Sequence, residues 1–259
     1  MTDAIAHSLR LDGRTALVTG ASSGFGAHFS RVLASAGARV VAAARRVDRL
    51  EALVESITEA GGQAMAVPMD VNDPESVTGA FDAIESAWGP VDLLVNNAGV
   101  ATPSKFVDST EDQWTFVVDT DLRAVWRVSR EASSRLVKAG RPGSIVNIAS
   151  ILGLQQGRNH TLYATAKAGV VQLTKNSAME LWRDGIRVNA LCPGYFETEL
   201  NSDFFQSERG QAYIESTPPR RLGRYPELDV PLLMLASDAG SFITGVALPV
   251  DGGHLLRSL

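Results

Sequence analysis

Short apolar runs alternate with longer amphipathic stretches along the chain. The short runs are apolar almost throughout, which is typical of parallel strands that are covered on both faces. We predict strands at Thr15–Thr19, Arg39–Ala44, Ala64–Met69, Val91–Val95, Ser144–Ala149, Arg187–Leu191 and Val246–Val250. The amphipathic stretches predict helices at Gly26–Ala36, Val47–Ala60, Pro74–Ala87, Gln113–Ala139, Leu162–Arg183 and Pro226–Ala236.

This alternation predicts the fold class. Repeated strand–helix units favour a parallel sheet with right-handed crossovers and helices on both faces. We therefore expect an α/β protein with a single doubly wound, Rossmann-type domain over residues 1–259, built on about seven parallel strands. Residues 1–10 are expected to form an N-terminal tail. Asn201–Arg224, with Pro218-Pro219 and mixed charges, is expected to be an irregular, mobile substrate loop.

Composition excludes several classes of protein. The 259 residues carry a formal net charge of −5, so no basic surface points to nucleic acid. The longest apolar runs, such as Val230–Ala236, fall far short of the roughly 18 residues of a membrane span, and Met1–Leu11 lacks a signal-peptide pattern. Cys192 is the one cysteine and the histidines are scattered, so we expect no disulfide and no metal site. The C-terminal Arg257-Ser258-Leu259 is no peroxisomal signal, and we expect a cytoplasmic protein.

A glycine-rich turn, Thr19–Gly26, follows the first predicted strand with the spacing G-x-x-x-G-x-G. Gly20 permits a tight turn, Gly24 lets the backbone approach a pyrophosphate, and Gly26 lets the helix lie close to the strand. The helix N-terminus then offers free N–H groups to a phosphate. The alternative is an ordinary strand-to-helix turn. The candidate cofactor-binding residues are Gly20, Ser22, Ser23, Gly24, Phe25 and Gly26.

The end of the second predicted strand indicates which dinucleotide the chain prefers. Folds that select NAD usually place Asp or Glu there, whereas Arg accommodates a 2′-phosphate. Here Ala44 occupies the acidic position and Arg45 and Arg46 follow. We interpret this as NADP(H) binding, with Arg45 as the first candidate phosphate ligand. The alternatives are that both arginines are solvated helix-entry charges, or that the chain prefers NAD(H).

Three polar residues suggest acid–base chemistry. Tyr163 and Lys167 stand four residues apart in a predicted helix, so they share one face. A neighbouring ammonium favours the phenolate, so we expect Lys167 to lower the pKa of Tyr163. Ser150 ends a strand at the edge of the sheet where ligands bind, and its hydroxyl can hold a substrate oxygen. Taken singly, Tyr163 also suits a half-buried helix aromatic, and Ser150 a cap.

In order and spacing these motifs resemble the classical short-chain dehydrogenase/reductase family from about Leu11 to Gly253. The resemblance rests on Thr19–Gly26, Asn96-Asn97-Ala98-Gly99, Tyr163–Lys167 with Ser150, Pro193-Gly194 followed by Thr198, and Asp251-Gly252-Gly253. It implies that Tyr163 is the acid–base, that Ser150 holds the substrate oxygen, and that Lys167 tunes Tyr163 and bonds the nicotinamide ribose. The further cofactor contacts that it implies are Asp70 and Val71 at the adenine, Asn97, Ala98 and Gly99 along the groove, and Pro193, Gly194, Phe196 and Thr198 around the nicotinamide.

One residue departs from the family pattern. The family commonly has Asn in an Asn-Leu-x-Gly context, and Asp121 takes that place here. The resemblance implies that the main-chain carbonyl of this residue holds a water that links Lys167 to solvent. A carboxylate near Lys167 would stabilise the charged form of the lysine and alter how Tyr163 titrates. The alternative is that Asp121 points elsewhere and is tolerated.

The sequence leaves the substrate open. The candidate substrate contacts are Ser150, Leu152, Leu154, Gln155, Gln156, His160 and Tyr195. This mixture suits a small-molecule ketone or secondary alcohol, of 3-oxoacyl, sugar, steroid, cyclic or aryl type. The second hypothesis is a non-catalytic dinucleotide-binding sensor or scaffold, which would have no need of Ser150, Tyr163 and Lys167 together. The resemblance also implies a homotetramer that buries the helices predicted at Gln113–Ala139 and Leu162–Arg183.

Overall fold

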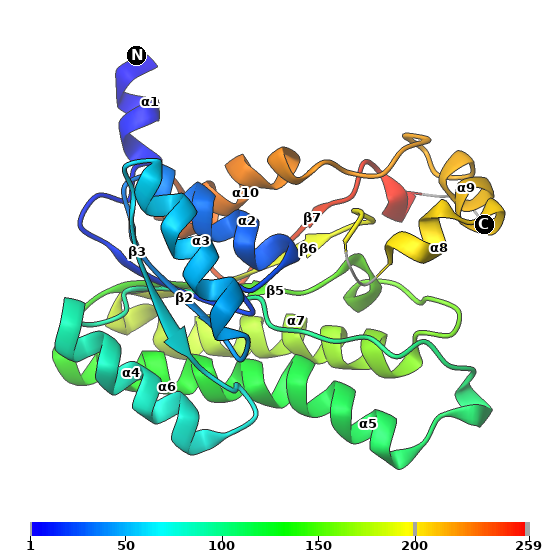
Figure 1. Ribbon diagram of the computed structural model, residues 1–259, viewed down its shortest axis with the longest axis horizontal. Coiled ribbons are helices and arrows are strands. Elements are labelled where there is room, and N and C mark those ends of the chain that lie inside the picture. Colours follow the sequence, from blue (N-terminus) through cyan, green and yellow to red (C-terminus); the bar gives the residue numbers. More distant parts are fainter. Residues whose placement is uncertain (1, 199–200, 257–259) are drawn as a thin grey trace.

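The chain folds around a seven-stranded parallel sheet in the order β3-β2-β1-β4-β5-β6-β7 (Figure 1). We describe a computed structural model, which covers residues 2–198 and 201–256. The strands are β1 (Thr15–Thr19), β2 (Arg39–Ala44), β3 (Gln63–Pro68), β4 (Leu93–Asn96), β5 (Gly143–Ile148), β6 (Ile186–Pro193) and β7 (Ala247–Val250). The predicted doubly wound α/β fold is confirmed, and each predicted strand corresponds to an observed one.

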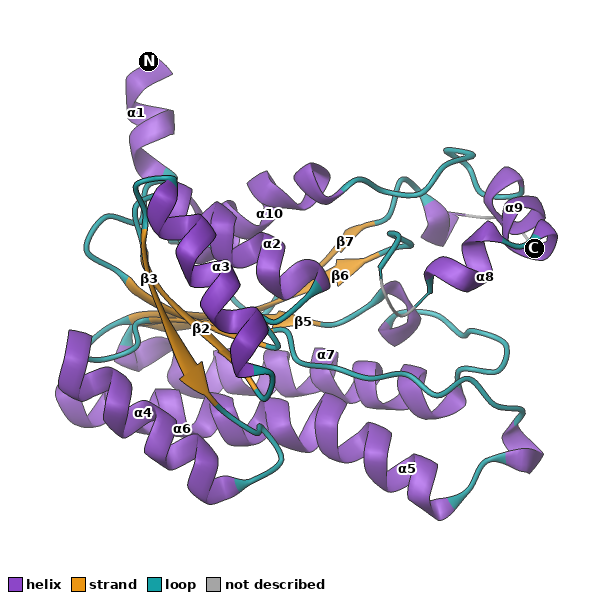
Figure 2. Ribbon diagram, in the orientation of Figure 1, coloured by secondary structure: helices purple, strands orange, loops and turns teal. Residues whose placement is uncertain are grey.

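The α-helices are α1 (Thr2–Ser8), α2 (Gly24–Ser35), α3 (Val47–Glu59), α4 (Pro74–Trp88), α5 (Glu111–Val118), α6 (Ala124–Ala139), α7 (Thr161–Leu181), α8 (Ser202–Gln206), α9 (Glu208–Glu215) and α10 (Asp229–Ala236). Helices α2, α3 and α10 form a layer on one face of the sheet and α4 to α7 a layer on the other, whereas α1, α8 and α9 lie outside these layers (Figure 2). On β1, Ala16 and Val18 belong to the core under α2 and α10, whereas Leu17 belongs to the core under α4 and α6. Both faces of the strand are therefore buried, which explains why its sequence does not alternate.

The order of the strands creates a topological switch point between β1 and β4. β1 pairs with both β2 and β4, so the chain winds outward in opposite directions from this point. Ligands of open α/β sheets bind at such a switch, outside the carboxyl ends of the strands. Gly20 follows β1 and Asn97 follows β4 at this edge.

The long predicted helix Gln113–Ala139 is interrupted in the structure. The π-helical turn Asp119–Arg123 separates α5 from α6. Such a turn carries one residue more than an α-helical turn, and π-turns are frequent at functional sites. Here it turns the side chains of Thr120 and Asp121 into the interior, where both are buried.

The expectation that Asn201–Arg224 is irregular was wrong, because two helices, α8 and α9, fall within it. Ser207 lies between α8 and α9, and its side chain accepts a hydrogen bond from the Gly210 N–H in the first turn of α9. Gly210 also lies so close to the backbone of Phe204 and Phe205 that a Cβ would not fit. Short helices of this kind depend on such local packing more than on hydrophobic periodicity. A helix, α1, likewise occupies most of the predicted N-terminal tail.

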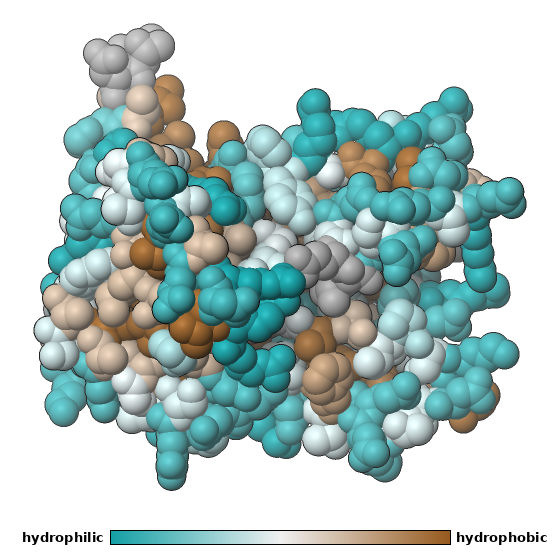
Figure 3. Space-filling view, in the orientation of Figure 1, coloured by the Kyte–Doolittle hydropathy of each residue, from teal (hydrophilic) through white to brown (hydrophobic). Residues whose placement is uncertain are grey.

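The surface of the molecule is largely hydrophilic on the face seen in Figure 3, with apolar side chains in small groups. No helix in residues 2–198 and 201–256 is long and apolar enough to cross a membrane. The large exposed apolar side chains include Trp114, Phe116 and Trp126 on α5 and α6, and Met179 on α7. The C-terminal tripeptide considered in the sequence lies outside the described residues.

Candidate functional site

The glycine-rich turn is shaped by the absence of side chains. Gly20 and Gly24 have φ angles of +65° and +54°, which favour glycine. A Cβ on Gly20 would stand 2.8 Å from the Ala98 Cα, and a Cβ on Gly26 would collide with the Gly20 carbonyl oxygen. Ser23 precedes α2 without a side-chain cap, so its hydroxyl does not occupy the N–H groups of the first turn. The glycine-rich turn and the free N–H groups of α2 therefore fit a phosphate group at the N-terminus of this helix.

The turn is tied to the end of β4 by hydrogen bonds. The Thr19 hydroxyl accepts from the N–H groups of Asn97 (2.9 Å) and Ala98 (3.0 Å). In return, the Asn97 side-chain amide donates to the carbonyls of Thr19 (2.9 Å) and Gly20 (3.3 Å). The predicted groove residues Asn97 and Ala98 therefore lie at the turn, where the Asn97 amide fixes its shape. Sequence reasoning did not single out Thr19, although a hydroxyl at the end of a buried apolar strand is a usable signal.

The two arginines after β2 have different surroundings. The Arg46 guanidinium donates to the hydroxyls of Ser22 (2.8 Å) and Ser23 (2.9 Å), and so reaches the glycine-rich turn. Arg45 is exposed and makes no side-chain hydrogen bond or ion pair among the described residues. Arg46 is thus the cation held at the turn, although the sequence placed Arg45 first.

The residues expected at the adenine follow β3. Asp70 accepts a hydrogen bond from the Asn72 N–H (2.9 Å), and the Val71 carbonyl accepts one from Arg127 (2.8 Å). The Asn72 side chain donates to the Thr120 hydroxyl (3.0 Å), which joins this segment to the π-turn. The segment after β3 and the turn that carries Asp121 are therefore connected by a hydrogen bond.

Ser150, Tyr163, Lys167 and Asp121 converge at the carboxyl edge of the sheet, and we call them the Tyr163 cluster. Ser150 follows β5, where its Oγ accepts from the Leu152 N–H (3.1 Å). The Lys167 Nζ lies 5.5 Å from the centre of the Tyr163 ring and donates to the Ile148 carbonyl (3.0 Å). The Lys167 side chain is only 4% exposed.

Asp121 points directly at this lysine. Its Oδ2 lies 3.3 Å from the Lys167 Nζ, and its Oδ1 accepts a hydrogen bond from the Val100 N–H (2.7 Å). The alternative that Asp121 points elsewhere is therefore wrong. Gly99 lies against the pair, because a Cβ there would stand 3.4 Å from Oδ2 and 3.5 Å from Nζ.

Burial and the charges of the neighbouring groups shift the pKa values of the Tyr163 cluster. Burial raises the pKa of Tyr163, and this outweighs the lowering effects of Lys167 and of the Ser150 hydroxyl. Lys167 therefore acts in the expected direction, but the net shift is upward because burial dominates and Asp121 opposes the lysine, neither of which the sequence could show. Burial lowers the pKa of Lys167, but Asp121 and Tyr163 outweigh it and the net shift is upward. Burial raises the pKa of Asp121, which Lys167 offsets in part.

The segment expected at the nicotinamide follows β6. Gly194 donates its N–H to the Val250 carbonyl (2.9 Å), and a Cβ on Gly194 would stand 2.8 Å from the Asp251 Cα. Phe196 is buried and packs edge-to-face on Phe25, with ring centres 5.4 Å apart. This contact brings the end of β6 against the glycine-rich turn. Pro193 ends β6, and the Thr198 N–H donates to the Asn201 side chain (2.8 Å).

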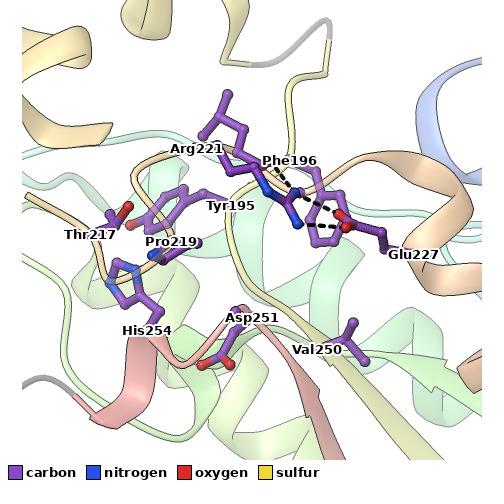
Figure 4. Close-up of a pocket in the computed structure, with 12 residues that line it drawn as sticks. Tyr195, Phe196, Thr217, Pro219, Arg221, Glu227, Val250, Asp251 and His254 are labelled. Atoms are coloured by element: carbon purple, nitrogen blue, oxygen red, sulfur yellow. Dashed lines mark hydrogen bonds and ion pairs between the residues drawn. The ribbon is translucent and has the colours of Figure 1, made fainter. Parts of the chain in front are cut away.

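A cavity opens beyond Tyr195, between the segment after α9 and the end of β7 (Figure 4). Its labelled lining residues are Tyr195, Phe196, Thr217, Pro219, Arg221, Glu227, Val250, Asp251 and His254. Tyr195 packs on Tyr213 and His254 with ring centres 5.3 Å apart in each case, and the Tyr213 hydroxyl lies 3.1 Å from the His254 Nε2. Arg221 forms a salt bridge with Glu227, with 2.6 Å between the guanidinium Nη2 and the carboxylate Oε1. The walls therefore combine aromatic and aliphatic side chains with a few charged ones, and the Arg221 cation is already paired.

The other predicted substrate residues do not line this cavity. Leu152 is buried, Gln155 and His160 are half-buried, and Leu154 and Gln156 are exposed on the segment between β5 and α7. Burial lowers the pKa of His160, which favours its neutral form. Among the described residues, no group of three or more His, Cys, Asp and Glu side chains is arranged to hold a metal ion.

Comparison with known proteins agrees with this geometry. The family model described as enoyl-(acyl carrier protein) reductase matches residues 20–254. The chain is 34% identical over 248 residues to the 3-oxoacyl-(acyl-carrier-protein) reductase of Thermotoga maritima, covering 96% of this chain and 100% of the relative. It is 38% identical over 248 residues to the 3beta-hydroxysteroid dehydrogenase 1 of Eggerthella lenta, covering 95% of each.

The fold agrees with solved structures as well. A gluconate 5-dehydrogenase from Burkholderia cenocepacia, in complex with NADP and tartrate, superimposes with a TM-score of 0.94 at 33% identity. The match covers 98% of this chain and 100% of that one. The chain therefore belongs to the short-chain dehydrogenase/reductase family and is an NAD(P)-dependent oxidoreductase.

Proposed function

We propose that the protein uses NADP(H) to interconvert a small-molecule ketone and the corresponding secondary alcohol, with Tyr163 as the acid–base group. The observation that carries this proposal is the convergence of Ser150, Tyr163 and Lys167 at the switch-point edge of the sheet. A non-catalytic dinucleotide-binding protein has no use for a partly buried phenol beside a buried ammonium. The sensor or scaffold hypothesis is therefore disfavoured.

The Ser150 hydroxyl is oriented to hold the substrate oxygen. Its Oγ already accepts from the Leu152 N–H, so its own hydrogen is left to donate. In the direction of reduction, Tyr163 gives its proton to the substrate oxygen and becomes a phenolate, which the Lys167 ammonium stabilises. In the direction of oxidation, the phenolate takes the hydroxyl proton back. When bound, the nicotinamide cofactor supplies or accepts the hydride at the substrate carbon.

The preference for NADP(H) rests on the end of β2. The place of a ribose-binding carboxylate is taken by Ala44, and the Arg46 guanidinium is held at the Ser22 and Ser23 hydroxyls. A guanidinium at this position is suited to a 2′-phosphate. The structural relative from Burkholderia cenocepacia, which was solved with NADP, supports the same preference.

The cavity beyond Tyr195 supports an uncharged substrate with an apolar body. Tyr195 lines this cavity and is near enough to Tyr163 to affect its pKa, so the cavity adjoins the proposed reaction centre. The aromatic rings of Tyr195 and Phe196 and the aliphatic side chains of Leu222 and Val250 offer apolar surface to such a substrate. Because Arg221 is paired with Glu227, it is not available to a carboxylate substrate. We therefore place a cyclic, aryl or steroid-like ketone ahead of a sugar acid.

We also propose that the whole chain is one domain and that it assembles as a homotetramer. The exposed Trp114, Phe116 and Trp126 on α5 and α6, together with Met179 on α7, support burial of these helices between subunits. Size-exclusion chromatography with light scattering tests this directly, and a monomer at all concentrations contradicts it.

The proposed reaction is tested by following the absorbance of reduced nicotinamide with NADPH and NADH over ketones of each class. We expect turnover with NADPH, and a fall of about 10²-fold or more in kcat for Tyr163→Phe because the proton donor is removed. The Kd for NADPH, measured by calorimetry, should stay within about twofold, because the hydroxyl alone is lost. Thr165→Ala, on the exposed side of α7, is the matched control. Retained turnover in Tyr163→Phe refutes the assigned acid–base group.

A further inference from the structure

Asp121 is a fully buried carboxylate, and its two oxygens differ in their partners. Its Oδ1 is satisfied by the Val100 N–H at 2.7 Å. Its Oδ2 accepts no hydrogen bond among the described residues and faces the Lys167 Nζ at 3.3 Å. A buried carboxylate without a partner is strongly disfavoured, so the ammonium is the group that makes this position tolerable.

Lys167 also depends on this contact. Its side chain is 4% exposed, and besides Asp121 its Nζ has the Ile148 carbonyl as a hydrogen-bond acceptor. A neutral acceptor alone does not balance a buried ammonium. The two side chains therefore form an ion pair with the Tyr163 ring alongside, at 5.5 Å from the Nζ to the ring centre.

Among the described residues, the other polar groups around Tyr163 and Lys167 carry no positive charge. Ser150, at the end of β5, offers a neutral hydroxyl. Cys192 on β6 is a protonated thiol, because burial raises its pKa to about 11. Tyr195, after β6, is a phenol, and His160, at the start of α7, is held toward its neutral form by burial. Within the part of the chain that the structure describes, the leading charges acting on Tyr163 are therefore those of Lys167 and Asp121.

We propose that the Asp121 carboxylate is a positioning residue that compensates the charge of Lys167 and so keeps Tyr163 a proton donor rather than a phenolate. This inference rests on the proposed role of Tyr163 as the acid–base group. In the ion pair, the carboxylate draws the ammonium toward the π-turn and opposes its field at the phenol. The ion pair therefore favours the reduction of a ketone, for which Tyr163 must carry its proton. The oxidation of an alcohol needs the Tyr163 phenolate, so its rate should rise only at higher pH.

The test is Asp121→Asn, which keeps the shape of the side chain and an acceptor for the Val100 N–H but removes the charge. The matched control is Asp119→Asn in the same π-turn, because Asp119 pairs with the exposed Arg123 at 3.0 Å rather than with Lys167. The Tyr163 phenolate is titrated by its ultraviolet absorbance without cofactor or substrate, as the difference between each protein and its Tyr163→Phe version. The pH profiles of kcat/KM are then measured in both directions.

We expect Asp121→Asn to move the Tyr163 titration down by about one pH unit, a tenfold rise in the phenolate fraction at a given pH below it. Ketone reduction should then decline at a lower pH, alcohol oxidation should begin at a lower pH, and Asp119→Asn should leave both profiles in place. An unchanged or upward-shifted titration in Asp121→Asn overturns the proposal. If Asp121→Asn does not fold, Asp121→Ser supplies the same comparison.

The two readouts separate this inference from the proposed function. A shifted titration in a protein that turns over no ketone or alcohol contradicts the proposed function but leaves the charge compensation standing. An unshifted titration together with loss of turnover in Tyr163→Phe contradicts the role of Asp121 alone.

Discussion

The glycine-rich turn and the Tyr163 cluster both lie at the carboxyl edge of the sheet, but different forces hold them in place. The turn is fixed by space, because Gly20 and Gly26 approach neighbouring backbone where no Cβ fits. The cluster is fixed by charge, because Asp121 and Lys167 are buried together and each compensates the other. The turn should therefore tolerate no added volume, whereas the cluster should respond most to substitutions that keep volume and change charge.

The largest effect on stability and cofactor binding should come from adding one methyl group to the turn. A Cβ on Gly26 would collide with the Gly20 carbonyl and stand 2.6 Å from the Asn97 Nδ2, so Gly26→Ala must push α2 away from β1. We expect a loss of about 1–3 kcal/mol in the free energy of unfolding and a loss of NADPH affinity of about tenfold or more. Chemical denaturation and calorimetry measure the two quantities.

Gly79→Ala is the matched control for this substitution. Gly79 lies within α4, is exposed and has nothing within 4 Å of its Cβ position. Alanine is favoured over glycine inside a helix by about 0.5–1 kcal/mol, so this change should stabilise the protein. If Gly26→Ala and Gly79→Ala change the free energy of unfolding in the same direction, close packing does not limit the turn as we describe.

A smaller effect should separate the two arginines that follow β2. Arg46 is held by Ser22 and Ser23 of the turn, whereas Arg45 has no such contact. We expect Arg46→Ala to raise the KM for NADPH by about tenfold with little change in the KM for NADH, because one charge-assisted contact is lost. Arg45→Ala should have a weaker effect of the same kind.

Steady-state kinetics with both cofactors decide between the arginines. A larger effect of Arg45→Ala would show that the free arginine is the phosphate ligand, as the sequence first indicated. Equal effects of Arg46→Ala on NADPH and NADH would contradict the proposed preference for NADP(H).

The same contrast explains how far the sequence could predict the molecule. Both the parallel sheet and the glycine-rich turn follow from local patterns, because buried strands are continuously apolar and tight turns require glycine. The π-turn at Asp119–Arg123 has no such pattern, so the sequence could not decide which way Asp121 points. The helices within Asn201–Arg224 were missed because they are short and stabilised by close packing at Gly210.

The cavity could not be predicted from the sequence either. Tyr195, Tyr213 and His254 meet there although they are far apart along the chain. No spacing rule connects an aromatic residue in α9 with one after β7. Of the predicted substrate residues, Tyr195 alone was placed at the cavity, because it follows a recognisable motif at the end of β6.

The smallest effect should come from the helix that leads to Asp121. Thr110 caps α5, where its hydroxyl accepts from the Gln113 N–H (3.2 Å) and the Gln113 side chain accepts from the Thr110 N–H (3.1 Å). Thr110→Ala should lower the free energy of unfolding by about 1 kcal/mol. Thr110→Ser should lower it by much less, because the capping hydroxyl is kept. Since Asp121 is fixed by Val100 and Lys167 rather than by this cap, the pH profile of catalysis should not move. Thermal unfolding and the pH dependence of kcat/KM measure the two effects. A pH profile that shifts with Thr110→Ala would show that helix stability, and not the ion pair, holds the cluster together.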